Sequence, residues 1–280
     1  MKKFIWFVLL ILSLFLINAC SIQSPDISTF NGKLVFFTVD VGQGDCLLIK
    51  TPGDNYVMID SGSQNEENKL KYFLNEYNIR RIDYVVVTHP HEDHIGNMDY
   101  IIKNFDVKKV YMPKVTSNTK SFENVMEAIK EKGLKINTAK AGVNFHLDGV
   151  EFKFLAPNRN HYEDLNNYSA VLMVSYDKNK ILLMGDAEKL SEDEIIKKFD
   201  VKADILKVGH HGSSSSTGSR FLNKVNPSYA VISCGKNNDY GHPHRETLSI
   251  LKKNNINILR TDIDGTIIFL LDGQKIELYR

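Results

Sequence analysis

The amino-acid sequence predicts a layered α/β fold built from two related halves. Runs of apolar and β-branched residues come first along the chain, and strand-like runs then alternate with helical patterns. A similar succession returns after about residue 150. No linker longer than a few residues interrupts residues 33–280, so we expect this region to be one domain. Alternation of this kind is typical of sheets that are covered by helices.

The expected strands are apolar or alternating runs, several of them separated by Gly, Asn or Asp turns. In the first half they are residues 33–40, 45–50, 55–60, 83–88 and 107–112. In the second half they are residues 150–155, 170–176, 180–185, 203–208, 229–233, 256–260, 266–271 and 274–279.

Helical patterns lie between these runs. The clearest are residues 66–77, 96–104, 119–132, 191–199 and 245–254. Ser191 and Glu194 have the spacing of a capping box, in which both side chains bind free backbone amides at the start of a helix. We therefore expect the fourth helix to begin there.

The composition is that of an ordinary globular protein. Of the 280 residues, 42% are hydrophobic and 25% are charged, which excludes a disordered or fibrous chain. The formal net charge is +1. Global charge therefore gives no support to nucleic-acid binding, which would depend on a local patch.

Residues 1–19 have the features of a secretory signal peptide. Lys2 and Lys3 precede an apolar run, and Ala19 precedes Cys20. A transmembrane helix is the alternative, but the apolar stretch is shorter than the roughly 20 residues that a bilayer span needs. Residues 20–32 are polar and turn-rich, and we expect them to form a short tether.

The segment L-I-N-A-C at residues 16–20 resembles the lipobox of bacterial lipoproteins, in which the cysteine is acylated. The resemblance implies an extracytoplasmic domain that is anchored to the cell membrane by lipid on Cys20. Cys46 and Cys234 lie beside or within strand-like runs. We expect buried free thiols there, with a disulfide between them as the alternative.

Three strand-like runs lead into histidine and aspartate residues, which are common metal ligands. Residues 83–88 lead into H-P-H-E-D-H at 89–94, residues 180–185 lead into Asp186, and residues 203–208 lead into His210 and His211. Strand ends often meet at one edge of an α/β fold. The alternative is that the histidines are ordinary surface or interior residues, but H-x-H-x-D-H is a demanding pattern.

The spacing of this cluster suits two metal ions. His89 and His91 point the same way from an extended segment, so both imidazoles can bind one ion. Asp93 and His94 lie on the following turn and suit a second ion about 3.5–4 Å away. Asp186 would bridge both ions. Either Zn²⁺ or Mn²⁺ fits histidine and carboxylate ligands.

H-x-H-x-D-H after a strand, followed by Gly-Asp at a strand end and then His, resembles the metallo-β-lactamase superfamily. D-V-G-Q-G-D at 40–45, N-Y-S at 167–169, L-K-V-G-H-H-G-S at 206–213 and G-H-P-H at 241–244 narrow the resemblance to the soluble hydrolase domain of ComEC-type competence DNA-uptake proteins. It covers residues 33–280 and not the membrane channel, so a role in DNA uptake does not carry over with it.

The resemblance implies a four-layer αββα sandwich. It assigns His89 and His91 to one ion, Asp93, His94 and His210 to the other, and Asp186 to both. Asp60 would orient a ligand histidine. Where typical members supply a third histidine to the first ion, this chain has N-N-Y-S at 166–169, with His161 upstream as a possible substitute.

The leading functional hypothesis is phosphodiester hydrolysis of DNA or RNA by a metal-bridging hydroxide. Asp93 and Asp186 would hold the ions, and His242 or His211 would supply a proton to the leaving group or contact phosphate. His244 is a less certain candidate for this role. A structural role for His242 and His211 is the alternative.

Other functions remain open. The fold also suits hydrolysis of phosphorylcholine esters, lactones, thioesters or β-lactams, and the altered third-ligand region suits a surface protein that binds DNA or metal without turnover. The serine-rich loop at 213–217 would hold phosphate through its amides or be a plain polar loop. A local basic patch, or merely scattered charges, would be formed by Lys207, Arg220, Lys236 and Arg245.

Overall fold

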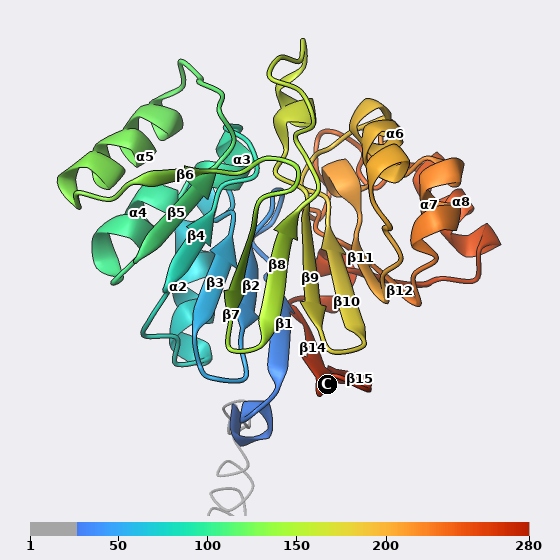
Figure 1. Cartoon of the computed structure of the whole chain (residues 1–280), viewed down its shortest axis with the longest axis horizontal. Helices are drawn as coiled ribbons and strands as arrows, with labels where there is room; N and C mark the ends of the chain where they lie inside the picture. Colours follow the sequence, from blue (N-terminus) through green and yellow to red (C-terminus); the bar gives the residue numbers. More distant parts are fainter. Residues whose placement is uncertain (1–26, 280) are drawn as a thin grey trace, which may run out of the picture.

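The computed structural model describes residues 27–279. Two β-sheets pack face to face and helices cover both outer faces, which confirms the predicted αββα sandwich (Figure 1). The predicted signal peptide and Cys20 lie outside the described residues. Among residues 27–279, no helix has the length and apolar character needed to cross a bilayer.

The first sheet has eight strands in the order β15-β14-β1-β2-β3-β4-β5-β6. Pairing is antiparallel from β15 to β3 and parallel from β3 to β6. The strands are β1 (Leu34–Thr38), β2 (Leu47–Lys50), β3 (Tyr56–Ile59), β4 (Tyr84–Val86), β5 (Lys109–Met112), β6 (Ile136–Thr138), β14 (Ile267–Leu271) and β15 (Ile276–Tyr279).

The second sheet has seven strands in the order β13-β12-β11-β10-β9-β8-β7. Here β10 to β13 are parallel and β7 to β10 are antiparallel. The strands are β7 (Asn144–Leu147), β8 (Val150–Phe154), β9 (Leu172–Tyr176), β10 (Asn179–Leu183), β11 (Ile205–Lys207), β12 (Tyr229–Ile232) and β13 (Asn257–Arg260).

Helices flank the two sheets on opposite sides (Figure 1). Beside the first sheet lie α2 (Glu67–Glu76), α3 (Glu92–Ile95), α4 (Met98–Asn104) and α5 (Lys120–Glu131). Beside the second sheet lie α6 (Lys189–Lys198), α7 (Ser219–Val225) and α8 (Arg245–Lys253), and α9 (Thr261–Asp264) follows β13. Short 3₁₀ turns are η1 (Ile27–Phe30), η2 (Gln64–Glu66), η3 (Leu165–Tyr168) and η4 (Gly209–Gly212).

Three apolar cores separate these layers. Strand side chains alternate between faces, so Leu34 and Phe36 of β1 enter the core between the sheets. Val35 and Phe37 of the same strand enter the core under α2, α4 and α5. A third core joins the second sheet to α6, α7 and α8. Since β1 is buried on both faces, it is an unbroken apolar run in the sequence.

Several elements differ from the sequence expectations. The strands β6 and β7 were not expected, because their outward residues are polar or exposed. The helices α3, α7 and α9 are only four to seven residues long and were also missed. Both predicted thiols, Cys46 and Cys234, are free and buried.

The predicted capping box is wrong. Helix α6 begins two residues earlier, at Lys189, after an N-cap at Glu188. The Ser191 hydroxyl donates to the backbone oxygen of Asn167, and Glu194 accepts a hydrogen bond from Tyr162. Both side chains therefore serve contacts with neighbouring segments, which sequence spacing does not reveal.

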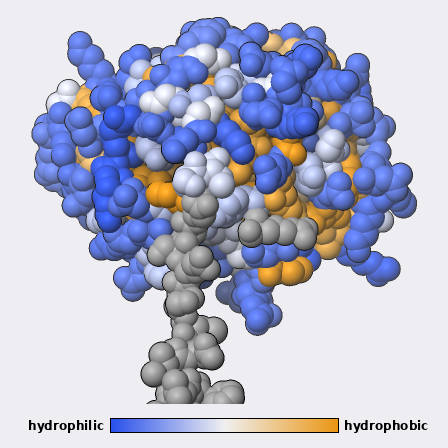
Figure 2. Space-filling model, turned by 90° about the horizontal axis from the view of Figure 1, so that it is seen from below, coloured by the Kyte–Doolittle hydropathy of each residue, from blue (hydrophilic) through white to orange (hydrophobic). Residues whose placement is uncertain are grey.

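The strand ends that lead into Asp93, Asp186 and His210 lie at the upper edge of the sandwich in Figure 1. The described chain begins at the opposite end, in η1. Figure 2 shows this lower face, where hydrophobic areas lie among hydrophilic ones. Phe30, in the predicted tether, is buried and packs edge-on against Phe37 and Tyr279. Packing at this end of the sandwich therefore includes η1.

Candidate metal centre

The H-x-H-x-D-H segment bends sharply after β4. His91 has extended backbone dihedrals and is the N-cap of α3, whose first turn contains Asp93 and His94. The amides of His94 and Ile95 both donate to the carbonyl of His91. This short helix turns the second pair of side chains away from the direction of His89, as the spacing predicted.

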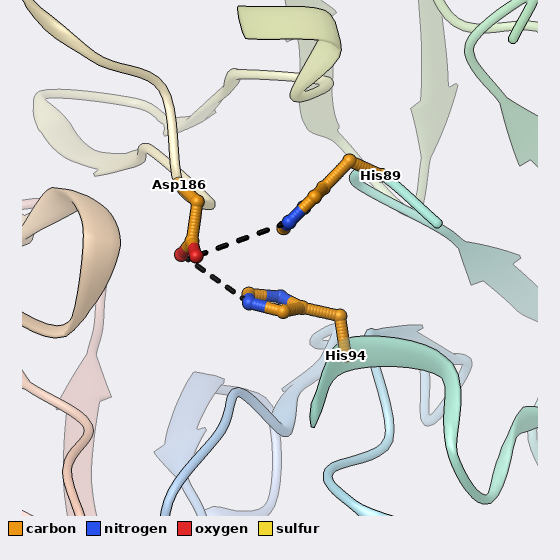
Figure 3. A group of neighbouring side chains, drawn as sticks. All are labelled: His89, His94 and Asp186. Atoms are coloured by element: carbon orange, nitrogen blue, oxygen red, sulfur yellow. Dashed lines mark ion pairs between the residues drawn. The ribbon is translucent and has the colours of Figure 1, made fainter. Parts of the chain in front are cut away.

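Asp186 reaches the same place from the second sheet (Figure 3). One carboxylate oxygen lies 3.3 Å from His94 Nε2 and the other lies 3.8 Å from His89 Nε2. The Asp186 amide donates to the Ser169 hydroxyl at 3.0 Å, which fixes the start of this turn. Side chains more than 90 residues apart in sequence therefore lie close together here.

A second group of ligand atoms adjoins the first. His211 Nε2 lies 3.2 Å from an oxygen of Asp93 and 3.5 Å from Asp186. His94 Nε2 lies 4.0 Å from Asp93. In each of the two groups, His89-His94-Asp186 and Asp93-His94-His211, one ligand atom from every residue lies within 4.8 Å of the others.

The neighbouring residue His210 was the predicted ligand of the second ion. Its Nε2 lies 3.7 Å from Asp186, and its side chain is partly exposed while that of His211 is buried. Both residues have left-handed backbone dihedrals. The assignment of His210 stays a prediction, and the geometry adds His211 as a second candidate for the same ion.

His91 lies beside His89 rather than in either group of three. Its Nδ1 is 3.0 Å from His89 Nε2, and the two rings meet edge-on. His91 also lines the cleft over the centre. It is therefore close enough to remain a candidate ligand of the first ion.

The donor atoms fit divalent metal ions. Three buried side-chain atoms, His94 Nε2, Asp186 Oδ1 and His211 Nε2, have no hydrogen-bond partner, although oppositely charged groups lie 3.2 to 3.5 Å from them. Buried polar atoms are almost always satisfied in folded proteins, so a group without partners needs an explanation. Imidazole nitrogens and carboxylate oxygens are ligands of Zn²⁺ and Mn²⁺. Metal coordination would satisfy all three atoms.

The charged side chains of the centre lie so close together that they shift one another's pKa values. Burial raises the pKa of Asp186, but the His211 and His94 imidazoles outweigh burial and hold it well below its usual value. Burial lowers the pKa of His94 and of His211, but the surrounding carboxylates raise both well above the usual value. Without metal, the carboxylates thus draw protons onto the two imidazoles, whose positive charge a metal ion would replace.

Buried carboxylates orient two of the imidazoles from behind. Asp60 accepts hydrogen bonds from the amide and hydroxyl of Thr88, and its Oδ2 lies 2.8 Å from His94 Nδ1. This contact agrees with the predicted role of Asp60. On the other side, His211 Nδ1 contacts the Ser233 carbonyl at 3.1 Å, and Asp45 Oδ1 lies farther from this nitrogen, at 3.5 Å. Each carboxylate contacts the ring nitrogen that faces away from the centre.

Lys207 explains how Asp45 is held. Its ammonium group lies 2.8 Å from Asp45 Oδ2 and donates to the Val208 carbonyl, and both side chains are fully buried. Burial raises the pKa of Asp45, but Lys207 and His211 hold it far below its usual value. The interpretation of Lys207 as part of a surface basic patch is therefore wrong. Arg220, another member, pairs with Asp193.

The region expected to hold a third histidine contains none near the centre. His161 is exposed, and its Nδ1 lies 3.4 Å from the Tyr168 hydroxyl. Asn167 contacts Glu188, and Ser169 lies 3.5 Å from His89 Nδ1. Within residues 27–279, His161 belongs to none of the possible ligand groups. A third ligand for the first ion is thus not supplied by this residue.

The serine-rich loop does not offer free amides. The amides of residues 213–216 donate to protein atoms within the loop or to His210 and His244. Those of Thr217 and Gly218 donate to the Glu192 carboxylate. Since all six amides already have partners, the geometry favours a plain polar loop over a phosphate-binding one.

A cleft of about 450 Å³ opens over the centre, and we call it the metal cleft. Four of its residues, Gln43, Glu92, Thr119 and Tyr240, were not predicted as functional, although Glu92 lies within the H-x-H-x-D-H segment. Gln43 and Tyr240 lie in or next to quoted motifs, whereas Thr119 is the N-cap of α5 and gave no chemical signal. The cleft is lined by Gln43, His91, Glu92, Asp93, Thr119, Asp186, His210, His211, Tyr240 and His242.

His242 lies on the wall of the metal cleft. Burial and the neighbouring His211 and His210 imidazoles lower its pKa to about 4. Its Nδ1 is buried and has no hydrogen-bond partner. His244, in contrast, accepts a hydrogen bond from the Ser214 amide.

Comparisons with known proteins agree with this geometry. A family model described as "Metallo-beta-lactamase superfamily" matches residues 39–236. The chain is 36% identical to "ComE operon protein 3" of Bacillus subtilis (strain 168) over 247 residues, which are 82% of this chain and 32% of the relative. It is 28% identical to "Competence protein ComA" of Neisseria gonorrhoeae over 86% of this chain and 33% of that protein. The chain thus spans about a third of the length of these curated relatives.

Among solved structures, the metallo-beta-lactamase fold protein YhfI from Bacillus subtilis is similar. The TM-score is 0.57 at 12% identity, and the match covers 85% of this chain and 99% of the other. At this identity the likeness supports the fold alone.

Proposed function

Because the chain belongs to the metallo-β-lactamase superfamily, we propose that it is a metal-dependent phosphodiesterase that hydrolyses DNA or RNA. The proposal depends on one observation: His89, His94 and Asp186, from both halves of the chain, bring ligand atoms within 4.8 Å of one another, and His94 Nε2 and Asp186 Oδ1 have no hydrogen-bond partner. One relative is named as a competence protein. This name favours a nucleic-acid substrate over a β-lactam.

Different residues of the chain would bind the metal ions and orient the metal ligands. His89, His91, Asp93, His94, Asp186 and either His210 or His211 would hold two divalent ions. Bound there, the ions would lower the pKa of water from 15.7 toward about 7 and neutralise charge on a phosphoryl oxygen. Asp60 and Asp45 keep His94 and His211 facing the centre.

His242 is the group best placed to contact the substrate. It lines the metal cleft, and its ring has a nitrogen without a partner. His211 is fully buried and lies between Asp93 and Asp186. We therefore assign contact with a phosphate or leaving-group oxygen to His242 and keep His211, beside His210, as a candidate metal ligand. His242→Gln should lower phosphodiesterase kcat while leaving metal content unchanged.

The test combines elemental analysis with a substrate panel. Purified protein loaded with Zn²⁺ or Mn²⁺ is assayed on plasmid DNA, single-stranded DNA, RNA, bis-p-nitrophenyl phosphate and nitrocefin. We expect two metal equivalents and cleavage of phosphodiesters that a chelator abolishes. Asp186→Asn should abolish cleavage, whereas Asp193→Asn, an exposed acid on α6, should not. Nitrocefin turnover without phosphodiesterase activity would contradict the proposal.

A second candidate is a non-catalytic surface protein that binds DNA or metal. The observation in its favour is that His161 lies away from the centre, so the first ion has fewer ligands than in typical members. Binding of two metal equivalents and of DNA in a gel shift, with no cleavage of any substrate in the panel, would support it.

We also propose that the protein is exported and anchored by lipid on Cys20. The strand ends that lead into the residues lining the metal cleft lie at the end of the sandwich opposite η1 (Figure 1), so an anchored domain would present the cleft away from the membrane. Cys20→Ser should release the protein from the membrane fraction, while Ser21→Ala should not. Equal release of both variants would contradict the anchor.

A further inference from the structure

The rim of the metal cleft carries one exposed aromatic ring. Tyr240 is 65% exposed, although it is large and mostly apolar. It lines the same cleft as Asp186 and His211. A large aromatic residue at the mouth of a polar site is placed to contact what enters the site.

The ring of Tyr240 continues a series of stacked rings. It lies on the His242 ring with a centroid distance of 5.6 Å and an interplanar angle of 16°. His242 in turn lies over His211 at 6.1 Å and 30°. Within the part of the chain that the structure describes, no further aromatic ring contacts Tyr240. The three rings therefore extend from His211 at the metal centre outward to Tyr240, whose other face has no aromatic neighbour among the described residues.

The loop that presents Tyr240 is held in place at several points. Asn238 donates to the carbonyls of Gly235 and His242 and accepts from the His242 amide. His244 Nε2 lies 3.2 Å from the Tyr240 carbonyl, and the His244 amide donates to the Gly212 carbonyl. The Tyr240 ring is thus carried by a loop whose backbone is held by hydrogen bonds.

We propose that Tyr240 is a stacking platform for one unpaired nucleobase next to the phosphate that enters the metal cleft. The proposal rests on the proposed function, because it is the phosphodiester in the cleft that places a base beside the ring. A base has a flat π-face of the size of the tyrosine ring, and stacking accepts any of the four bases. Bases inside a duplex have no free face, so the platform selects single-stranded ends or segments.

The binding test separates bases from phosphates. Metal-depleted protein is titrated with a fluorescently labelled oligothymidylate and with an abasic oligomer of equal length, and affinity is read by anisotropy. The wild type should bind the oligothymidylate about tenfold more tightly, as expected for one stacked base. Tyr240→Ala should lose this difference and Tyr240→Phe should keep it. Tyr72→Ala, an equally exposed tyrosine on α2, should also keep it.

A kinetic arm uses the metal-loaded protein. The p-nitrophenyl ester of thymidine 5′-monophosphate carries a base, and methyl p-nitrophenyl phosphate does not. Tyr240→Ala should raise KM for the nucleotide ester more than KM for the methyl ester. A similar increase for both esters would indicate loop damage and would overturn the platform.

The outcomes also separate this proposal from the proposed function. If the wild type prefers the oligothymidylate but cleaves neither ester, hydrolysis of phosphodiesters fails and the platform stands. If the wild type cleaves both esters while Tyr240→Ala keeps the full preference for bases, the platform fails and hydrolysis stands. Equal affinity of the wild type for both oligomers likewise overturns the platform.

Discussion

The two buried imidazoles His94 and His211 are fixed by what lies behind them. Asp60 contacts Nδ1 of the first, and the Ser233 carbonyl contacts Nδ1 of the second with Asp45 nearby, so that Nε2 of each ring faces the centre. A carboxylate behind a ligand histidine sets the tautomer and makes the ring a better ligand. Asp45 itself depends on Lys207, whose buried ammonium group lies 2.8 Å from its carboxylate and, together with His211, offsets the burial of this charge.

Removing one member of the Asp45–Lys207 pair should be costly. Lys207→Met leaves a buried carboxylate without its cation, and such losses cost about 3–5 kcal/mol. Asp45→Asn strands the ammonium instead and should have a similar effect. Urea unfolding gives the free energy of unfolding of each variant, and the double variant should lose less than the sum of the two single ones.

The matched control for this pair is Lys120→Met, which breaks the exposed pair with Glu123 on α5. Exposed pairs contribute at most about 1 kcal/mol. If Lys207→Met were as mild as Lys120→Met, the buried pair would not hold Asp45 in place.

The sequence indicated which kinds of side chain gather at the centre, but it did not determine which of two adjacent residues faces it. His89, Asp93, His94 and Asp186 were found because they follow strands, and strands end at a common edge. His210 and His211 are adjacent and both have left-handed dihedrals, so the direction of each ring depends on a turn that spacing does not determine. Lys207 was misplaced because the three-residue strand β11 gave no sign that its last side chain enters the interior.

Among the elements, the loop between β1 and β2 packs closely against α3, the helix that contains Asp93 and His94. Gly44 has φ of +133°, and a Cβ atom there would lie 2.2 Å from the carbonyl oxygen of Asp93. The Asp45 amide donates to the same carbonyl. Only glycine allows this close approach. The loop thus sets the position of a metal-binding helix from the far side.

Gly44→Ala should therefore displace Asp93 and weaken metal binding by about 10- to 100-fold, as loss of a supporting contact does at other metal sites. Competition with a chromophoric chelator measures the affinity. Gly133→Ala is the control, because Gly133 also has positive φ but a Cβ atom there would meet nothing within 4 Å. Equal loss in both variants would mean that backbone strain, and not the contact with Asp93, is responsible.

Helix α6 is joined to the start of α7 by Glu192, whose buried carboxylate accepts from the Thr217 and Gly218 amides. Burial raises its pKa from 4.5 to about 7, although both hydrogen bonds oppose the shift. Between these two values the folded protein binds a proton that the unfolded chain does not. The contribution of Glu192 is therefore fully present below pH 4.5 and is lost as the pH rises toward 7.

The expected size of this loss is on the order of 3 kcal/mol between about pH 4.5 and 7. Glu192→Gln keeps the shape of the side chain but does not titrate. The free energy of unfolding of the wild type relative to this variant should fall steadily from pH 5 to pH 8 in urea titrations. A constant difference over that range would show that Glu192 is ionised at all these pH values.

Elements were predictable where burial makes a repeating pattern. Strands such as β1 and β14 are buried along their whole length and were expected from their apolar runs. All three residues of β6 are exposed, and β7 alternates only weakly, so neither had a hydrophobic signal. The start of α6 was misjudged because Ser191 and Glu194 bind other segments instead of their own helix end.

For the whole molecule, the two related halves were predictable because the order of strands and helices repeats along the chain. Periodicity did not predict which edges of the two halves meet. The expectation that they meet at the metal centre came from the histidine and aspartate residues at the strand ends. The centre draws His89, Asp93 and His94 from the first half and Asp186 and His211 from the second. No disulfide joins the halves within residues 27–279. A metal ion held by these residues would therefore link the two sheets at this edge.

Metal removal should lower the stability of the entire domain, because an ion that binds only the folded state adds RT ln(1 + [L]/Kd) to the free energy of unfolding. Each tenfold rise in free metal above Kd should add about 1.4 kcal/mol. Thermal unfolding at a series of buffered metal concentrations measures this dependence. His89→Ala and Asp186→Ala remove a ligand from opposite sheets, so each should flatten the dependence of Tm on metal. His146→Ala, an exposed histidine on β7, should retain it. If Tm of the wild type did not change with metal, or if His146→Ala behaved like His89→Ala, the ion would not join the two halves at this site.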